Sequence, residues 1–375
     1  MKIGFDAKRL FNNSTGLGNY SRYVVSALSA HYPDNQYFLY TPSIKNLKNT
    51  KDFLEASNYR VQLPSGLYSK SFLKSFWRSW LLGNIAANDG IDVFHGLSHE
   101  LPVTKPVGLK TVVTVHDLIF MRYPEFYSSI DVNIYTWKLK RAVKSADRII
   151  AISEQTKSDL VHFLHVDPSQ VDVVYQGCNS IFKTRHSTDE INKIRLKYAL
   201  PSEFLLNVGT VEHRKNALLI LQALVKMRNK LPVVIVGRKT DYVKQLNEFI
   251  HEHNIGKWVH FIHEVEFEDL PMIYQAADIF IYPSLFEGFG IPIVEAISCG
   301  TPVVSSKGSC FTEAGGPDSL YINSSNSEEL ASVLDELIED DVLRKSMISK
   351  SMDYIKKFEP QVIAADLMNV YKKIN

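Results

Sequence analysis

The sequence predicts an α/β protein of two Rossmann-like domains, each built around a parallel sheet. Three observations support this fold class. The chain has 375 residues, more than the roughly 100 to 200 residues of a typical domain. Short apolar runs alternate with helix-period segments in both halves, as in stacked βαβ units. Val233 to Val236 is a run of β-branched residues, which suits a strand that helices cover on both faces.

Ten short runs are the expected strands. Those of the first half are Ile3 to Asp6, Gln36 to Tyr40, Ile91 to His95, Thr111 to Val115 and Arg148 to Ile152. After turn residues between Tyr175 and His186, the second half continues with Phe204 to Val208, Pro232 to Val236, Val259 to Ile262, Asp278 to Tyr282 and Pro302 to Ser305. We therefore place the two domains at 1–181 and 182–358.

Composition excludes several classes of protein. Hydrophobic residues make up 45% and charged residues 22%, which excludes disordered, collagen-like and coiled-coil chains. Lys and Arg total 42 against 41 for Asp and Glu, so no nucleic-acid partner is expected. Three scattered cysteines are too few for a disulfide framework. Without a signal peptide or an apolar run long enough to span a bilayer, we expect a cytoplasmic protein, free or peripheral on the inner face of the cytoplasmic membrane.

The glycine-rich segment after Tyr282 is the densest chemical signal. Ligands of parallel sheets bind beyond the carboxyl ends of the strands. Gly288 and Gly290 let the backbone approach a ligand, and the following helix N-terminus offers N–H groups to hydroxyl or phosphate oxygens. Glu287 and Glu295 could each bind adjacent sugar hydroxyls, because a carboxylate has two acceptor oxygens. Alternatively, Glu295 only complements the helix dipole and Glu287 is solvated.

The segment Leu270 to Glu313 resembles the retaining nucleotide-sugar glycosyltransferases of family 4. The matching motifs are Pro283-Ser284, Glu287-Gly288-Phe289-Gly290, Glu295-Ala296 and Gly300-Thr301-Pro302. The resemblance implies the GT-B fold, in which two Rossmann-like domains face a central cleft. It implies that Glu295 binds the ribose of the donor and Glu287 lies by the transferred sugar, with Gly288, Phe289 and Gly290 beside them. It also implies an acceptor-binding first domain, a donor-binding second domain, and a final helix whose segment 359–375 crosses back to the first.

Two adjacent cations, Arg214 and Lys215, follow the strand that ends before Gly209. A leaving diphosphate develops negative charge, which such cations stabilise. By resemblance, Lys215 has the position of the family's phosphate-binding lysine. The family often has arginine directly after the glycine, where this chain has Thr210, so we assign the second charge to Arg214. The alternative is a solvated basic turn.

A glycine loop opens the first helical pattern at Gly16 and Gly18. Ser21 stands where a dinucleotide fingerprint has its third glycine, and no acidic residue ends the second strand, which disfavours a nicotinamide cofactor. By resemblance the two glycines line the reaction centre, near the donor phosphates and the acceptor. An ordinary tight turn is the alternative.

His116 lies just beyond the strand Thr111 to Val115 and resembles the family's histidine beside the transferred sugar. The alternative is a structural histidine. His95 and His99 also follow a strand, and we interpret them as structural or cleft-lining residues.

A candidate membrane-binding helix spans residues 70–82. Phe72, Phe76, Trp77 and Trp80 lie on one side at helical spacing, while Lys74 and Arg78 lie elsewhere. The helix could lie in an anionic membrane interface beside a lipid-linked acceptor, or pack its aromatic face on the first domain.

We therefore expect a retaining hexosyltransferase that moves mannose or glucose from a nucleotide diphosphate to a saccharide or lipid-linked acceptor, in cell-surface polysaccharide or lipopolysaccharide O-antigen synthesis. The expected catalytic residues are His116, Arg214, Lys215 and Glu287. No Asp-x-Asp triplet occurs, so we expect no metal ion, and no cofactor beyond the donor. The alternatives are a non-catalytic sugar-nucleotide-binding or regulatory protein, and a nicotinamide oxidoreductase.

Overall fold

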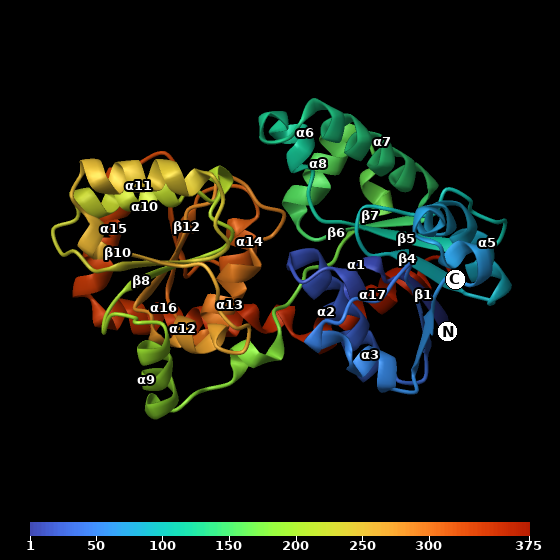
Figure 1. Ribbon diagram of the computed structural model, residues 1–375, viewed down its shortest axis with the longest axis horizontal. Coiled ribbons are helices and arrows are strands. Elements are labelled where there is room, and N and C mark those ends of the chain that lie inside the picture. The colour runs from blue at the N-terminus through green and yellow to red at the C-terminus, as the bar shows by residue number, and fades with distance from the viewer. The chain divides into compact units, whose positions relative to one another are not determined.

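A computed structural model describes all residues from 1 to 375, which form two compact units. Unit 1 contains Met1–Gly177 and Phe358–Asn375, and unit 2 contains Cys178–Lys357. Figure 1 shows each unit as a sheet with helices on both of its faces. The boundaries expected from the sequence lie within four residues of these.

The sheet of unit 1 has seven strands, and all of its neighbouring pairs are parallel. In spatial order the strands are β3 (Tyr59–Gln62), β2 (Gln36–Tyr40), β1 (Lys2–Asp6), β4 (Val93–Gly96), β5 (Lys110–Val115), β6 (Arg148–Ala151) and β7 (Val171–Val173). In the central pair, Phe5 lies opposite His95. The residues that follow β1 and β4 therefore share one edge of the sheet.

The α-helices of unit 1 come from both ends of the chain. They are α1 (Lys8–Asn12), α2 (Gly16–His31), α3 (Asp52–Glu55), α4 (Lys74–Phe76), α5 (Leu82–Asn88), α6 (Ile119–Arg122), α7 (Ser129–Ser145), α8 (Glu154–Leu164) and α17 (Pro360–Lys372). Figure 1 shows α7 and α8 on one side of the sheet and α2 and α17 on the other. The last helix, α17, packs against α2. Unit 1 therefore depends on residues from the C-terminal end of the chain.

Unit 2 has a sheet of six parallel strands. In spatial order they are β10 (Val259–Ile262), β9 (Val233–Val236), β8 (Leu205–Val208), β11 (Ile279–Tyr282), β12 (Val303–Ser306) and β13 (Leu320–Ile322). Every side chain of β9 and β11 is buried. This agrees with the apolar runs in the sequence, since helices cover both faces of such strands.

The α-helices of unit 2 are α9 (Thr188–Lys197), α10 (Ala217–Lys226), α11 (Tyr242–Glu252), α12 (Leu270–Ala276), α13 (Ile291–Cys299), α14 (Phe311–Gly315), α15 (Ser327–Glu339) and α16 (Asp341–Tyr354). In Figure 1, α10 and α11 lie on one side of the sheet and α12 and α13 on the other. The main core contains Leu221, Leu224, Ile235 and Leu334, from α10, β9 and α15. This core fixes the loops that follow β8 and β11.

The segment 70–82 is not one helix. It consists of a 3₁₀ turn η3 (Ser71–Leu73), α4 and a π-helical turn η4 (Trp77–Leu81). Trp77 is only 4% exposed because it packs with Phe38 and Tyr40, so its prediction as a membrane-contact residue is wrong. The exposed aromatic residues are Phe72, Phe76 and Trp80. No helix in the structure has the length and apolar character needed to cross a bilayer.

Candidate active site

The loops after β8 and β11 meet at the carboxyl edge of the unit 2 sheet. The first loop forms a 3₁₀ turn, η8 (His213–Lys215), which ends at Asn216 in the left-handed conformation, with φ +57°. The Asn216 side-chain amide donates to the carbonyl oxygen of Pro283 at 3.1 Å. The backbone N–H of Leu285 donates to the carbonyl of Arg214 at 2.9 Å. These bonds hold η8 against the glycine-rich segment.

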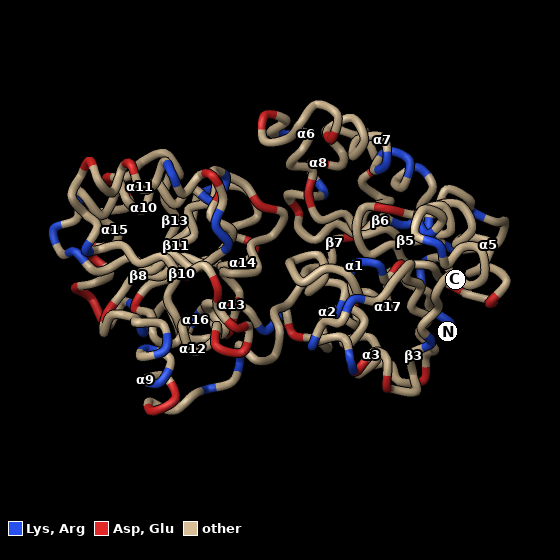
Figure 2. Tube along the Cα trace, viewed as in Figure 1, with Lys and Arg blue, Asp and Glu red and all other residues tan.

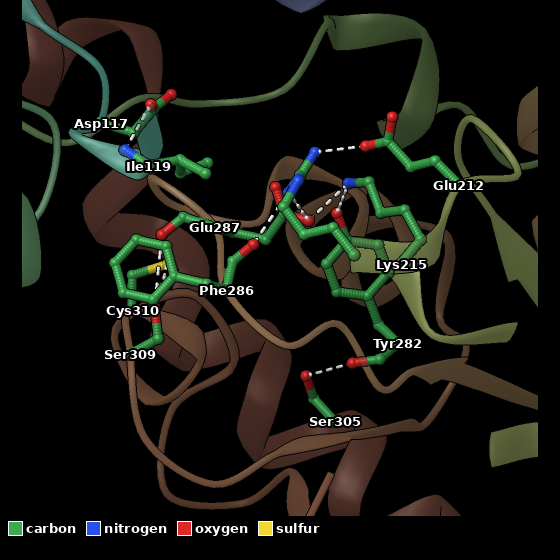
Figure 3. A network of polar contacts seen from close by, with 11 residues as sticks. Asp117, Ile119, Glu212, Lys215, Tyr282, Phe286, Glu287, Ser305, Ser309 and Cys310 are labelled. Carbon is green, nitrogen blue, oxygen red and sulfur yellow. Dashed lines mark hydrogen bonds and ion pairs between the residues drawn. The ribbon is translucent and has the colours of Figure 1, made fainter. Parts of the chain in front are cut away.

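Three of the predicted residues form one ion cluster there. One carboxylate oxygen of Glu287 lies 2.6 Å from Lys215 Nζ and 2.6 Å from Arg214 Nη1. Arg214 also donates to the carbonyl of Phe286 at 2.8 Å and to Glu212 at 2.7 Å. Figure 3 shows Glu287 and Lys215 pointing toward one another. The structure therefore brings Arg214, Lys215 and Glu287 together, and excludes both a solvated basic turn and a solvated Glu287.

Electrostatics keeps the Glu287 carboxylate ionised. Burial opposes ionisation, but the charges of Lys215 and Arg214 and their hydrogen bonds lower the pKa of Glu287 to about 2. Burial lowers the pKa of Lys215, and Glu287 opposes that shift. The pKa of Arg214 is raised, because Glu287 and Glu212 outweigh the effect of burial. Two cations thus share the buried Glu287 carboxylate, and Arg214 also pairs with the more exposed Glu212.

Tyr282 completes the cluster and was not predicted. Lys215 Nζ donates to its hydroxyl at 2.5 Å and lies 4.8 Å from the ring centroid. The Ser305 hydroxyl donates to the Tyr282 carbonyl at 2.8 Å, as Figure 3 also shows. Burial, reinforced by Glu287, raises the pKa of Tyr282 well above its usual value, so the phenol stays neutral. In the sequence, Tyr282 is indistinguishable from an ordinary core residue at the end of a buried strand.

Glu295 lies in α13 and forms no ion pair. Its carboxylate accepts a hydrogen bond from the Tyr274 hydroxyl at 3.1 Å. Burial raises the pKa of Glu295 to about 7, although Tyr274 and the charge of Lys215 oppose this shift. The partly buried Glu295 carboxylate therefore has Tyr274 as its one hydrogen-bond partner, which leaves acceptor capacity for a ligand hydroxyl. Tyr274 was also missed in the sequence.

Two glycines around the cluster adopt positive φ angles, which favour glycine. Gly209 adopts φ +152°, and a Cβ there would lie 3.5 Å from the Lys215 side chain. Gly290, at φ +100°, immediately precedes α13. Gly288 is buried, and the Phe289 ring is only 2% exposed. The Phe289 side chain is therefore part of the core, and only the Phe289 backbone could contact a donor.

Gly16, Gly18 and His116 belong to unit 1, whereas the ion cluster belongs to unit 2. A Cβ at Gly18 would lie 1.9 Å from the Asn13 carbonyl oxygen, whereas Gly16 faces open space. The Gly18 N–H donates to the Thr15 carbonyl at 2.9 Å. Gly18 therefore closes the loop, and its N–H is occupied within the protein.

His116 is buried in a fixed tautomer. Its Nε2–H donates to the Leu97 carbonyl at 2.9 Å, and Tyr20 packs edge-on against the ring at 4.5 Å. Burial and the neighbouring His99 lower the pKa of His116 to about 3. The imidazole is therefore neutral at pH 7, and its Nδ1 can accept a hydrogen bond but cannot donate one.

His95 is a structural residue. Its two ring nitrogens bond to the Tyr371 hydroxyl at 2.7 Å and to the Thr114 hydroxyl at 2.8 Å. His99 stacks on His116 with ring centroids 5.3 Å apart. The His116 backbone N–H donates to His99 Nε2 at 3.3 Å. His99 thus holds both the ring and the backbone of His116 in position.

The chain matches two family descriptions in succession. Residues 15–180 match "Glycosyltransferase Family 4", and residues 189–353 match "Glycosyl transferases group 1". This chain is a family 4 glycosyltransferase. The ion cluster therefore lies in the part of this glycosyltransferase that matches the group 1 description, and His116 lies in the part that matches family 4.

Two curated relatives act on O-antigen chains. O-antigen chain mannosyltransferase B of Escherichia coli is 26% identical over 391 aligned positions, covering 99% of this glycosyltransferase and 100% of the relative. O-antigen chain mannosyltransferase RfbU of Salmonella typhimurium is 26% identical over 261 positions, covering 70% and 68%. The first similarity extends across both units.

Solved structures share the fold. Anabaena HepE, solved with UDP and glucose, superposes with a TM-score of 0.75 at 20% identity and full coverage of both chains. WaaG, a glycosyltransferase involved in lipopolysaccharide biosynthesis, superposes with a TM-score of 0.72 at 16% identity, covering 99% of each chain. This family 4 glycosyltransferase therefore has the GT-B fold of two parallel-sheet Rossmann-like domains.

Proposed function

We propose that this glycosyltransferase transfers mannose from a nucleotide diphosphate donor to an acceptor hydroxyl, with retention at the anomeric carbon, during O-antigen or related polysaccharide synthesis. Its similarity to O-antigen mannosyltransferases supports the sugar and the pathway. The observation that carries the proposal is the single Glu287 carboxylate held by both Arg214 and Lys215. Such preorganised cations stabilise a diphosphate leaving group.

The donor would bind in unit 2. Glu295 carries acceptor capacity and no cation, so it suits the two ribose hydroxyls of a nucleotide. Lys215 and Arg214 would meet the diphosphate oxygens. Glu287 would orient these cations and receive a hydroxyl of the transferred sugar. The backbone N–H groups at Gly288 to Gly290 would add neutral donors.

The chemical step would depend on positioning and electrostatics. The Glu287 carboxylate is occupied by two cations, so it is a poor covalent nucleophile. We therefore favour attack and departure on the same face, with a leaving phosphate oxygen accepting the proton of the acceptor hydroxyl. His116 in unit 1 would accept a hydrogen bond from a sugar hydroxyl at Nδ1, because its Nε2–H is occupied by Leu97.

A panel of nucleotide sugars with candidate acceptors tests the proposal. We expect release of nucleoside diphosphate with a mannose donor, at an unchanged rate in the presence of a chelator. Lys215→Ala should lower the rate about 100 to 1000-fold, since it removes a preorganised charge. Lys226→Ala is the matched control, because that lysine pairs with Glu328 at the surface. The enzyme proposal fails if the wild-type protein releases diphosphate from no donor.

We also propose a peripheral association with the cytoplasmic face of an anionic membrane. Phe72 is 76% exposed, Phe76 is 44% exposed and Trp80 is 48% exposed. Lys70 and Lys74 lie in the same segment. Exposed aromatic side chains with adjacent lysines favour the interface of an anionic bilayer.

Liposome sedimentation tests this association. The double substitution Phe72→Ser, Trp80→Ser should weaken binding to anionic vesicles and leave diphosphate release from a soluble acceptor unchanged. Trp77→Ser is unsuitable because Trp77 belongs to the core. Leu196→Ser, at an 83% exposed position of unit 2, is the control. Equal sedimentation of the wild type and the double variant removes the membrane surface from the proposal.

A further inference from the structure

A group of cations lies at the carboxyl edge of the unit 1 sheet, outside the ion cluster described above. Lys8 and Arg9 open α1, directly after β1, and α1 is labelled in Figure 2. The helix is anchored by the fully buried Leu10 and Phe11, while Lys8 and Arg9 stay partly exposed. The side chains of Lys8 and Arg9 form no hydrogen bond or ion pair in the structure. Two adjacent cations are thus held on a fixed helix without a protein partner.

The nearby carboxylates are already occupied. Arg78 donates to Asp6 through Nε and Nη2, with Nη2 2.5 Å from Oδ2, and its Nη1 lies 2.5 Å from Glu100. Lys138 adds a second cation to Glu100 at 3.1 Å. Arg78 and Lys138 therefore already balance the charges of Asp6 and Glu100. The group of four cations and two carboxylates keeps two excess positive charges, those of Lys8 and Arg9.

Burial and the neighbouring positive charges disfavour the ionised form of Lys8. Burial lowers the pKa of Lys8, and the positive charges of Arg78 and Arg9 lower it further, against Glu100 and Asp6. A bound anion would reverse these effects, because an opposite charge at close range favours the ionised ammonium group.

His99 adds a neutral donor to the same edge. It follows β4, which pairs with β1, and it adopts a left-handed φ of +60°. Its Nε2 accepts the His116 backbone N–H, so the ring proton resides on Nδ1. That Nδ1–H has no acceptor on the protein. Burial lowers the pKa of His99 to about 4; Glu100 opposes this shift, and the charge of Arg9 adds a smaller lowering effect.

We propose that Lys8, Arg9 and His99 form a phosphate-binding subsite for the acceptor. The three donors follow the neighbouring strands β1 and β4 at one edge of the sheet, where Asp6 and Glu100 are already paired, and their two charges match a phosphate dianion. The subsite deepens the proposed function, on which it rests, by naming the acceptor class: a saccharide that carries a phosphoryl group, as a phosphate ester or through a lipid-linked phosphate. The cations of unit 2 remain assigned to the donor.

Phosphate binding to the full chain tests the subsite without turnover. Inorganic phosphate is titrated at constant ionic strength into Lys215→Ala, in which the donor site is impaired, and into the same chain with Lys8→Gln and Arg9→Gln. We expect the added pair to weaken phosphate affinity roughly tenfold or more, since two charge-assisted contacts are lost. Lys45→Gln with Lys51→Gln removes two exposed lysines of the same unit and should change nothing. Equal phosphate affinity with and without Lys8 and Arg9 overturns the subsite.

Steady-state kinetics then identify the source of the phosphate. In the otherwise wild-type chain, the double substitution Lys8→Gln, Arg9→Gln should raise KM for the phosphorylated acceptor. Two acceptors are compared, a phosphate ester of the saccharide and its lipid-linked phosphate form, and the one with the raised KM identifies the source of the phosphate. KM for the unphosphorylated saccharide and for the donor should not change. A raised donor KM would reassign the cations to the donor diphosphate and overturn the acceptor role. Failure of the proposed function gives a different result from failure of the subsite. In that case the wild-type chain transfers no sugar, while its phosphate binding can still be measured.

The stability of the variants separates binding from a structural role. Because Lys8 and Arg9 make no internal bond, Lys8→Gln and Arg9→Gln should leave Tm unchanged or raise it. A drop in Tm, with unchanged phosphate affinity, would show that the two cations serve the fold alone.

Discussion

Glu295 is the residue whose chemistry depends most on pH. A carboxylate that binds ribose hydroxyls must be ionised to accept from both, and burial raises the pKa of Glu295 to about 7. Donor affinity should therefore increase as pH rises through about 7. Tyr274→Phe removes a hydrogen bond that lowers this pKa, so the rise should move to higher pH. Donor dissociation constants measured from pH 6 to pH 9 check this, and an unchanged pH profile in Tyr274→Phe would contradict it.

The same carboxylate makes folding stability depend on pH. Its pKa in the folded state lies above the ordinary value of 4.5, so its contribution is fully present below pH 4.5 and is lost as pH rises through about 7. The loss reaches up to about 3 kcal/mol. Glu295→Gln should therefore raise Tm at pH 8 and change it little at pH 5. Glu268→Gln, at an exposed position, is the control and should shift Tm at neither pH.

Part of the candidate site could be predicted from residue types. Arg214, Lys215 and Glu287 were identified because they follow predicted strands, where parallel sheets bind ligands, and because their charges suit a diphosphate and sugar hydroxyls. Tyr274 and Tyr282 were missed, because their rings fill the core as phenylalanine would and only the position of the hydroxyl reveals a polar role. The pairing of Glu287 with both cations depends on bringing two loops together, which no local pattern encodes.

At the scale of elements, the two glycines in the first turn of α2 offer a matched pair of substitutions. Gly18→Ala would place a methyl group 1.9 Å from a carbonyl oxygen of the loop backbone, so the loop must rearrange. Gly16→Ala meets no atom within 4 Å. We expect Gly18→Ala to lower Tm by several degrees and Gly16→Ala to leave it nearly unchanged, in a thermal melt followed by circular dichroism. Similar effects of both substitutions would contradict the packing role of Gly18.

The strands show which elements a sequence pattern can reveal. All ten predicted strands are present within two residues of their expected bounds. The three that were missed, β3, β7 and β13, are edge strands. An edge strand pairs on one side only, so a short and partly polar segment suffices. Asp172 in the middle of β7 shows this, since it binds Arg148 and Lys373 at the surface. Thus β3 and β7 include polar residues, and β13 has only three residues, so none of the three has an apolar run as long as those of the central strands.

At the scale of the whole molecule, unit 1 depends on α17. The Tyr371 hydroxyl bonds to the buried His95 at 2.7 Å. Tyr371→Phe leaves that nitrogen without a partner and should reduce the free energy of unfolding by about 1 to 3 kcal/mol. Lys373→Gln breaks an ion pair with Asp172 at a half-exposed position and should cost less than about 1 kcal/mol. Urea denaturation measures both, and equal effects would argue against the His95 bond as the anchor of the helix.

The chain enters and leaves unit 2 at one place. The Tyr23 hydroxyl donates to the Phe358 carbonyl at 3.0 Å, and a Cβ on Gly177 would lie 2.3 Å from both of those oxygen atoms. Unit 2 is therefore a continuous insertion, whereas unit 1 is assembled from two distant stretches. Unit 2 is one continuous stretch that is synthesised in full before α17, so its folding does not depend on any later segment. Unit 1 must wait for the last helix, and its incomplete apolar face is the surface that a chaperone would need to shield.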